Sequence, residues 1–244
     1  MSNYYKILNW DTQFFDFKVV EIKKDIFTDF NMKEVLEDLD NDQVKLGYYT
    51  SSKFLKDVRS DVYEIKFIIK RIPLEKKILT HKPFHDHIEL YNEVSVDEAL
   101  IRLAQLAGRQ GRFGNDINIS DTLCDEIFKN WMINSVNKKM ASHILVYKVA
   151  SKIVGFASID IRNGKGYTPL FAVDRDFEGR GVSFALMRAA ETVLYEEGCP
   201  IAVGGTQELN QKALKVYQRY GLIPQEPEYV YHIWKKDFIK STYE

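Results

Sequence analysis

Cysteine is scarce in this sequence, which holds two in 244 residues. Cys124 and Cys199 are far apart, lie among apolar residues and lack the close spacing of metal ligands. These features favour two reduced thiols over a disulfide. We therefore expect no cross-link.

An excess of charge of one sign is also missing. Lysine and arginine number 34 and aspartate and glutamate 35, so no overall field draws the chain to nucleic acid or to anionic lipid. No apolar run approaches the ~18 residues that span a bilayer, and the first residues lack the basic and apolar regions of a signal peptide. We expect a cytoplasmic protein without membrane insertion or a nucleic-acid partner. Any anionic ligand must therefore be bound by groups at its own site, because the overall charge does not attract it.

Apolar residues make up 45% of the sequence, enough to fill a core, and the residue pattern changes near residue 90. The first part is rich in lysine, aspartate and aromatics, with strand-like runs at 44–50 and 62–71 and a helical run at 31–39. Residues 82–91 read as a connection. The sequence predicts a smaller α/β domain over 1–90, which contributes to an acceptor site or a dimer contact, and a catalytic domain over 91–244.

The second part has a regular alternation of helical and strand periodicity. Its expected order is α-α-β-β-β-α-β-α-β, with turn sequences between the three successive strands that favour antiparallel pairing. The expected helices are 97–110, a segment capped by Ser120, 182–197 and 210–220, and the expected strands are 144–148, 153–161, 167–173, 201–203 and 229–234.

A glycine-bearing turn at residues 178–183 joins the third of these strands to the long helix. Successive N–H groups can converge there, and the helix N-terminus adds its positive dipole, so the main chain can bind a phosphate or pyrophosphate. Arg180 could add a charge-assisted contact. A plain strand-to-helix turn that needs glycine for its backbone angles explains these six residues equally well.

Two nucleotide motifs fit this turn poorly. The Gly-Lys-Ser/Thr ending of a P-loop is absent, which excludes that motif. A dinucleotide fold needs a third glycine, where Phe184 stands, and repeated parallel βαβ units, whereas antiparallel hairpins come before this turn.

The loop and its surroundings resemble the GNAT superfamily of N-acetyltransferases from about residue 98 to 234. That loop reads Gln/Arg-x-x-Gly-x-Gly/Ala, and here Glu178 and Ser183 take the first and last positions while Gly181 matches. A carboxylate at 178 repels a pyrophosphate unless it points away. The resemblance implies a mixed, largely antiparallel sheet flanked by helices, and acetyl-CoA as cosubstrate. It also implies cofactor contacts from the loop: Gly179, Arg180, Gly181, Val182 and Ser183.

A second block resembles the final helix of that family. Asn210-x-x-Ala213-x-x-x-Tyr217-x-x-x-Gly221 places Asn210 and Tyr217 on one helical face. The resemblance implies that Asn210 faces the cofactor and that Tyr217 protonates the leaving thiolate; simple packing of Tyr217 against the sheet is the alternative. It also implies that main-chain N–H groups at the edge formed by Phe171, Ala172 and Val173 stabilise the oxyanion of the transfer.

Three further segments resemble the dTDP-fucosamine acetyltransferases and their relatives, which acetylate the amine of a nucleotide-linked dideoxysugar. They are residues 8–17, 103–113 and 229–234. The resemblance implies a dTDP- or UDP-linked amino sugar as acceptor, with weak candidate contacts from Arg112, Tyr231 and His232. By themselves, the aromatics of residues 8–17 predict a buried cluster, and pairing of two chains through this aromatic part stays open.

Two other functions stay open: acetylation of a peptide or protein amine, and a GNAT-like module that binds CoA without catalysis. Near the expected boundary, His81, His85 and His87 lack supporting ligands at suitable spacing. We expect a polar connection there and no metal.

Overall fold

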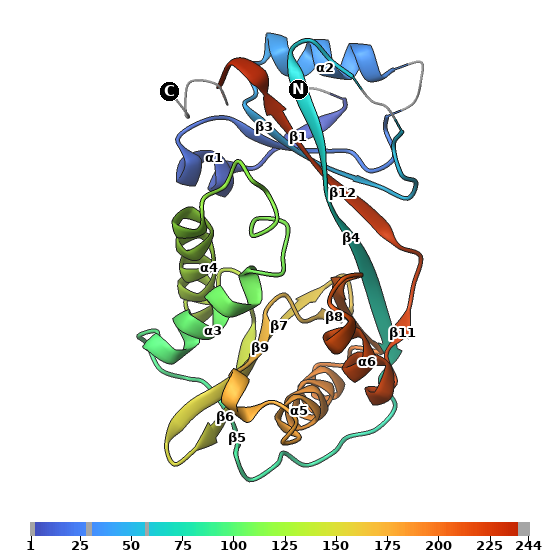
Figure 1. Ribbon diagram of the computed structural model, residues 1–244. Coiled ribbons are helices and arrows are strands. Elements are labelled where there is room, and N and C mark those ends of the chain that lie inside the picture. The colour runs from blue at the N-terminus through green and yellow to red at the C-terminus, as the bar shows by residue number, and fades with distance from the viewer. Residues whose placement is uncertain (1–2, 28–30, 57–58, 239–244) are drawn as a thin grey trace. The chain divides into compact units, whose positions relative to one another are not determined.

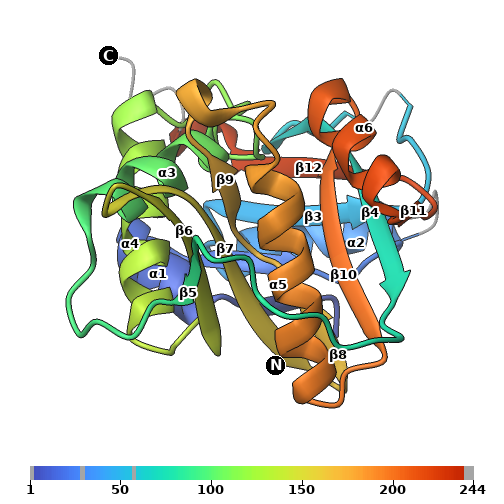
Figure 2. The ribbon, with the colours of Figure 1, turned by 90° about the horizontal axis from the view of Figure 1, so that it is seen from below.

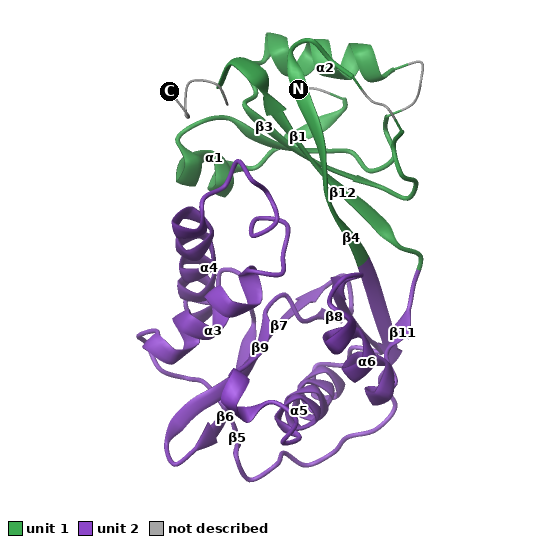
Figure 3. Cartoon of the chain, in the orientation of Figure 1, with its two compact units in different colours: residues 1–71, 226–244 green, residues 72–225 purple. Residues whose placement is uncertain are grey.

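The computed structural model describes residues 3–27, 31–56 and 59–238 and divides the chain into two compact units. Unit 1 comprises residues 1–71 and 226–244, and unit 2 comprises residues 72–225 (Figure 3). The chain enters unit 2 within one long strand and returns to unit 1 with the last strand.

Unit 1 is built on a mixed sheet with strand order β1-β2-β3-β12-β4 (Figure 1). Strand β2 runs parallel to β3, and the other neighbours pair antiparallel. The apolar stripe of α2 provides Val35 and Leu39 to a core that includes Tyr49 and Ile233. The elements of unit 1 are β1 (Tyr5–Ile7), α1 (Asn9–Phe15), β2 (Val19–Ile22), α2 (Met32–Asn41), β3 (Leu46–Ser51), the first part of β4 (Tyr63–Lys77) and β12 (Glu228–Lys235).

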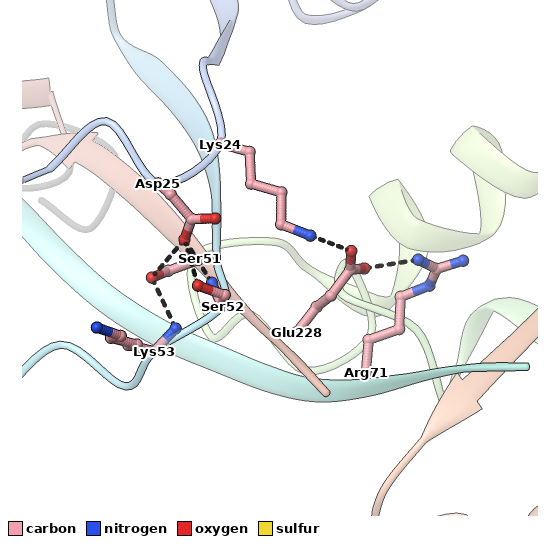
Figure 4. A network of polar contacts seen from close by, with 7 residues as sticks. All are labelled: Lys24, Asp25, Ser51, Ser52, Lys53, Arg71 and Glu228. Atoms are coloured by element: carbon pink, nitrogen blue, oxygen red, sulfur yellow. Dashed lines mark hydrogen bonds and ion pairs between the residues drawn. The ribbon is translucent and has the colours of Figure 1, made fainter. Parts of the chain in front are cut away.

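Two carboxylates organise polar contacts at the ends of β3 and β12 (Figure 4). Asp25 accepts hydrogen bonds from Ser51 and from the main chain and hydroxyl of Ser52. Glu228 binds Lys24 at 2.6 Å and Arg71 at 2.8 Å. Burial alone would raise the pKa of both carboxyls, but these donors outweigh it and hold each pKa below its ordinary value.

Unit 2 holds a second sheet path, β4-β10-β8-β7-β6-β5, in which β10 runs parallel to β8. Strand β9 pairs with β7, and β11 pairs with the last part of β4. The further elements of unit 2 are β5 (Ile88–Leu90), α3 (Glu98–Gly108), α4 (Asp121–Val136), β6 (His143–Val149), β7 (Lys152–Arg162), β8 (Lys165–Tyr167), β9 (Phe171–Val173), the short 3-10 helix η1 (Arg175–Phe177), α5 (Val182–Glu196), β10 (Ile201–Gln207), α6 (Gln211–Tyr220) and β11 (Ile223–Pro224).

Helix α5 packs directly on the sheet of unit 2 (Figure 2). Leu186 is fully buried in a cluster with Leu145 and Ala157 of β6 and β7. Gly155 allows the close approach, because a Cβ there would stand 3.0 Å from a methyl of Val182. Helices α3 and α4 contact β6, β7 and β9 from the other side of the sheet. The sheet of unit 2 is therefore a rigid support for the segments that end at β9, α5 and α6.

The predicted helices and most predicted strands are confirmed, including the cap at Ser120. Asp97 caps the helix that was expected to begin with it, and Gly198 and Gly221 follow α5 and α6 with positive φ angles. The single strand expected over 167–173 is wrong. It divides into β8 and β9, because Pro169 has no N–H and cannot continue the hydrogen-bonded ladder. The short elements β1, α1, β2, β5 and β11 were not predicted.

Two expectations about the first part of the chain differ from the structure. The compact units do not divide at residue 90: residues 72–90 belong to unit 2, and residues 226–244 belong to unit 1 because β12 pairs with β3 and β4. The aromatics of α1 do form a cluster, with Trp10 stacked on Phe14 at 5.1 Å. Helix α1 buries none of its residues fully, so this cluster is half-exposed rather than buried.

Candidate functional site

Strands β8 and β9 leave a free main-chain edge in unit 2. The parallel pairing of β10 with β8 ends where the Thr168 N–H donates to the carbonyl of Val203, and β9 continues along β7 alone within the described residues. The Asp174 N–H donates to Val154, so by antiparallel alternation the amide of Ala172 also faces β7. The N–H groups of Phe171 and Val173 therefore point away from β7.

The turn after β9 presents a second group of main-chain donors. Gly179 and Gly181 have φ angles of 73° and 83°, and Gly181 caps α5 without a side-chain hydrogen bond. In the described part of the chain, no acceptor bonds the N–H groups of residues 179–184. Because the helix dipole adds positive charge at this end, the turn is suited to a phosphate or pyrophosphate.

The carboxylate of Glu178 is held by a cation from another helix. Lys212, in the first turn of α6, forms an ion pair with it, and the two side chains are 69% and 39% exposed respectively. Lys212 thus compensates the charge that would otherwise oppose an anion at the turn. The sequence does not predict the role of Lys212, because no local spacing links position 212 to position 178.

Tyr217 lies on α6 with its ring edge-on to Phe171 of β9, at a centroid distance of 6.1 Å. Burial raises the pKa of Tyr217 to about 12. The hydroxyl has no hydrogen-bond partner within the described residues and is not among the buried unpaired groups, so it stays open to a ligand. A proton donor therefore stands beside the free edge of β9.

Asn210 ends the strand-to-helix connection rather than starting the helix. Its side-chain oxygen accepts a hydrogen bond from the Ala213 N–H at 3.1 Å, which caps α6. This cap fixes the beginning of the helix that carries Tyr217. The side-chain oxygen is used by the cap, and the amide nitrogen is the part of Asn210 left for a ligand.

A cavity of about 580 Å³ opens beside the N-terminus of α5. It lies against the connection between β4 and β5, and Figure 2 shows that segment crossing α5. Its lining combines three cations and one carboxylate with four aromatic rings. The lining residues are Lys82, Pro83, Phe84, His85, Asp86, Tyr147, Arg180, Gly181, Phe184, Ala185, Arg188 and Tyr220. Apart from Arg180 and Gly181, none of these residues is predicted from the sequence as a cofactor contact, and His85 enters the sequence analysis only as a possible metal ligand.

The lining of this cavity does not include the candidate acceptor residues. Arg112 follows α3 in unit 2, and its guanidinium lies over the Phe113 ring at 4.7 Å. Tyr231 and His232 belong to unit 1 and are 2% and 0% exposed. The Tyr231 hydroxyl accepts a hydrogen bond from the Leu55 N–H. Because both side chains are buried, we do not include them among acceptor contacts.

The histidines of the β4–β5 connection make ring and ion-pair contacts. His85 and His87 stack near Tyr147, and His81 lies 3.1 Å from Glu196. Across the described ranges, no group of three or more His, Cys, Asp or Glu could hold a metal ion. Cys124 and Cys199 are free thiols, both buried. Within those ranges, no helix is both long and apolar enough to cross a membrane.

Comparison with known proteins relates unit 2 to one enzyme family. The sequence model described as "Acetyltransferase (GNAT) family" matches residues 110–222. The chain is 29% identical over 137 residues to the spore coat polysaccharide biosynthesis protein SpsD of Bacillus subtilis. That match covers 56% of this chain and 47% of SpsD, so the chain spans about half the length of this curated relative.

Solved structures share the fold at low sequence identity. A functionally unknown conserved protein from Staphylococcus epidermidis aligns with a TM-score of 0.58 and 14% identity, covering 96% of this chain and 92% of that one. A GCN5-related N-acetyltransferase from Sphaerobacter thermophilus aligns with a TM-score of 0.54 and 14% identity, covering 93% and 75%. These likenesses concern the arrangement of helices and strands.

Proposed function

We propose that residues 110–222, which match the family model, form an acetyltransferase domain and that the chain transfers the acetyl group of acetyl-CoA to an amine. One observation carries the proposal. Unit 2 brings together the free edge of β9, the uncapped N-terminus of α5 and the unbonded hydroxyl of Tyr217. These are a site for a carbonyl oxygen, a site for a pyrophosphate and a proton donor.

The chemistry follows from these groups. The amine nitrogen attacks the thioester carbonyl, a C–N bond forms, and the oxygen becomes an oxyanion that the N–H groups of Phe171 and Val173 stabilise. The C–S bond then breaks, and Tyr217 donates its proton to the leaving thiolate. The proton lost by the amine restores the phenol. Because both substrates react while bound to one protein, proximity lowers the barrier without a covalent enzyme intermediate.

Pyrophosphate binding rests on the turn at residues 179–184. Its unbonded N–H groups supply donors, Arg180 supplies a charge, and Lys212 neutralises the nearby carboxylate of Glu178. The proposed binding uses main-chain donors and therefore does not depend on the side chains of Glu178 and Ser183, which differ from the family pattern.

We further propose a nucleotide-linked amino sugar, dTDP- or UDP-linked, as the acceptor. The similarity to a protein of spore coat polysaccharide biosynthesis and the resemblance of residues 8–17 and 103–113 to nucleotide-sugar acetyltransferases support this class. Arg112, which lies at the end of the second segment, is the residue we assign to the acceptor's diphosphate.

A thiol-release assay with acetyl-CoA and a panel of dTDP- and UDP-linked amino sugars tests the proposal, with peptide amines as a second panel. Turnover with one or more of the sugars supports both the reaction and the acceptor class. Turnover with peptides alone keeps the reaction and overturns the sugar acceptor. No turnover, together with acetyl-CoA binding in calorimetry, would indicate a CoA-binding module without catalysis.

A further inference from the structure

Helix α6, which carries Tyr217, is not anchored by a buried apolar face. None of its residues is fully buried, whereas the neighbouring α5 buries every residue from 189 to 194 (Figure 2). Because so little apolar surface of α6 is removed from water, packing alone does little to determine how this helix is turned about its axis. Its directed polar contacts therefore carry most of that specification.

In its last turn, α6 meets a buried carboxylate of α5. The Tyr220 hydroxyl donates a hydrogen bond to one oxygen of Glu191, which is 7% exposed. The Lys76 ammonium, from β4, lies 2.5 Å from the other oxygen and 4.1 Å from the centre of the Tyr220 ring. We call Lys76, Glu191 and Tyr220 the triad. Both carboxylate oxygens have a partner, and the triad joins α6 to α5 and to β4.

The two partners of Tyr220 belong to firmly held parts of unit 2. Glu191 lies within the buried row of α5, and the strand that carries Lys76 is anchored by the fully buried Leu74. The ring of Phe184, also on α5, meets the Tyr220 ring edge-on at 5.5 Å. The triad therefore ties a weakly packed helix to a rigid support.

A buried ion pair such as that of Lys76 and Glu191 adds little net stability, because desolvation offsets most of the attraction between the charges. Its directed contacts specify instead how the participating groups are arranged. Burial, and then the hydrogen bond to the Glu191 carboxylate, raise the pKa of Tyr220. The Tyr220 hydroxyl therefore keeps its proton and remains the donor.

Tyr217 and Tyr220 are three positions apart, so they project from neighbouring turns of one side of α6. A rotation of α6 about its axis would move both hydroxyls together. We propose that Tyr220 is a positioning residue of the acetyl-transfer site, because its hydrogen bond to Glu191 fixes the rotation of α6 and thereby holds the Tyr217 hydroxyl beside Phe171 and the free edge of β9. This inference rests on the proposed function and deepens it.

The Tyr220→Phe variant removes the hydroxyl and keeps the ring. In the thiol-release assay with acetyl-CoA and the dTDP- and UDP-linked amino sugars, it should lower kcat by about 10- to 100-fold, as a displaced reacting group does, and leave the KM for acetyl-CoA unchanged. In the Tyr217→Phe background the same change should lower kcat by less than about twofold, because no donor is left to position. Equal losses in both backgrounds would overturn the inference.

Tyr91→Phe is the matched control. Tyr91 is a buried tyrosine of unit 2 whose hydroxyl donates to the carbonyl of Ser95 at 2.7 Å. Its replacement removes one buried hydroxyl and one hydrogen bond far along the chain from α6, and it should leave kcat unchanged. A loss of kcat in Tyr91→Phe as large as in Tyr220→Phe would contradict a specific role of Tyr220.

Two double variants separate the hydrogen bond from the ion pair. Lys76→Met with Glu191→Gln leaves an amide oxygen that accepts from Tyr220, and it should keep kcat within about threefold of the unaltered protein. Lys76→Met with Glu191→Leu removes the acceptor and should lower kcat as Tyr220→Phe does. Because neither leaves a buried charge without its partner, both should fold, which circular dichroism checks. Equal kcat values in the two would overturn the inference.

NMR of the protein with isotope-labelled tyrosine rings tests the positioning without an acceptor. The Tyr217 signal, identified by its loss in Tyr217→Phe, should shift in Tyr220→Phe and keep its place in Tyr91→Phe. An unshifted signal in Tyr220→Phe would overturn the inference. If Tyr217→Phe lowers kcat while Tyr220→Phe does not, the positioning role fails and the proposed function stands. If Tyr217→Phe keeps its full kcat, the proposed proton donor fails with it.

Discussion

The ring of Tyr217 stands edge-on to the ring of Phe171, with an angle of 80° between the two planes and 6.1 Å between the centroids. This contact joins α6 to β9, the strand whose Phe171 and Val173 N–H groups face away from β7. An aromatic pair of this geometry is worth about 1 kcal/mol beyond its buried area. It therefore fixes the hydroxyl relative to the main-chain donors.

The raised pKa of Tyr217 predicts a stability change at high pH. Its pKa of about 12 exceeds the ~10 of an unfolded chain, so the folded state holds this proton more tightly. The resulting stabilisation is complete below pH ~10 and is lost as pH rises through about 12. Urea unfolding at pH ~10 and at pH ~12 should show a smaller loss of unfolding free energy for Tyr217→Phe than for the unaltered protein. Equal losses would contradict the assigned pKa.

Alanine substitutions at the glycines on either side of α5 should distinguish an effect on stability from an effect on acetyl-CoA binding. Gly181→Ala places a Cβ on a residue with φ of 83° and should cost about 1 kcal/mol of stability. It should also weaken acetyl-CoA binding, because the N–H groups of the turn shift. Gly198→Ala is the matched control: φ is 71° there, at the other end of α5. Gly198→Ala should lower the unfolding free energy by a similar amount and leave the acetyl-CoA affinity unchanged. An equal loss of affinity in both variants would argue against the turn as the pyrophosphate site.

The ion pair between Lys212 and Glu178 predicts a non-additive effect on acetyl-CoA affinity. Lys212→Gln leaves the carboxylate uncompensated beside the pyrophosphate and should weaken binding severalfold. Glu178→Gln alone should not weaken it. In the double variant the affinity should return toward that of the unaltered protein, and calorimetry of the four proteins measures this coupling. A double variant as weak as Lys212→Gln would mean that Lys212 binds the ligand directly.

In unit 1, Glu228 should contribute to the loss of stability at acid pH. Two cations outweigh burial and lower its pKa, so its stabilisation is present above the pKa of ~4.3 in an unfolded chain and is lost as pH falls through the lower folded pKa. Glu228→Gln should lower the unfolding free energy at pH 7 by about 1 kcal/mol and flatten its fall in acid. Glu226→Gln, an exposed neighbour, should do neither. If the unfolding free energy of Glu228→Gln fell in acid as steeply as that of the unaltered protein, this contribution would be contradicted.

Local signals predicted most of unit 2. Helical stripes, the cap at Ser120 and the glycine after the last helix depend on residues a few positions apart, and the structure agrees with them. Pro169 is a further local signal, because its missing N–H explains the division of β8 from β9.

The remaining differences come from contacts between distant residues. Three such contacts each join positions more than 30 apart in sequence. They are the pairing of β12 with β3, the ion pair of Lys212 with Glu178 and the hydrogen bond from Thr192 to the carbonyl of Lys82. Periodicity carries no information about such contacts. A family pattern in the sequence is enough to name Tyr217 and Gly181 as candidates. Lys82 and Arg188 can be named only from the structure, because they come together in the lining of the cavity.

The comparison of Tyr217→Phe with Tyr195→Phe in the thiol-release assay tests the acetyl-transfer site most directly. Tyr195 is a 47% exposed tyrosine on α5 and serves as the matched control. With acetyl-CoA and the acceptor saturating, Tyr217→Phe should lower kcat by about 100-fold, as loss of a general acid does, while the affinity for acetyl-CoA and the control's kcat stay unchanged. An undiminished kcat in Tyr217→Phe would contradict the proposed site.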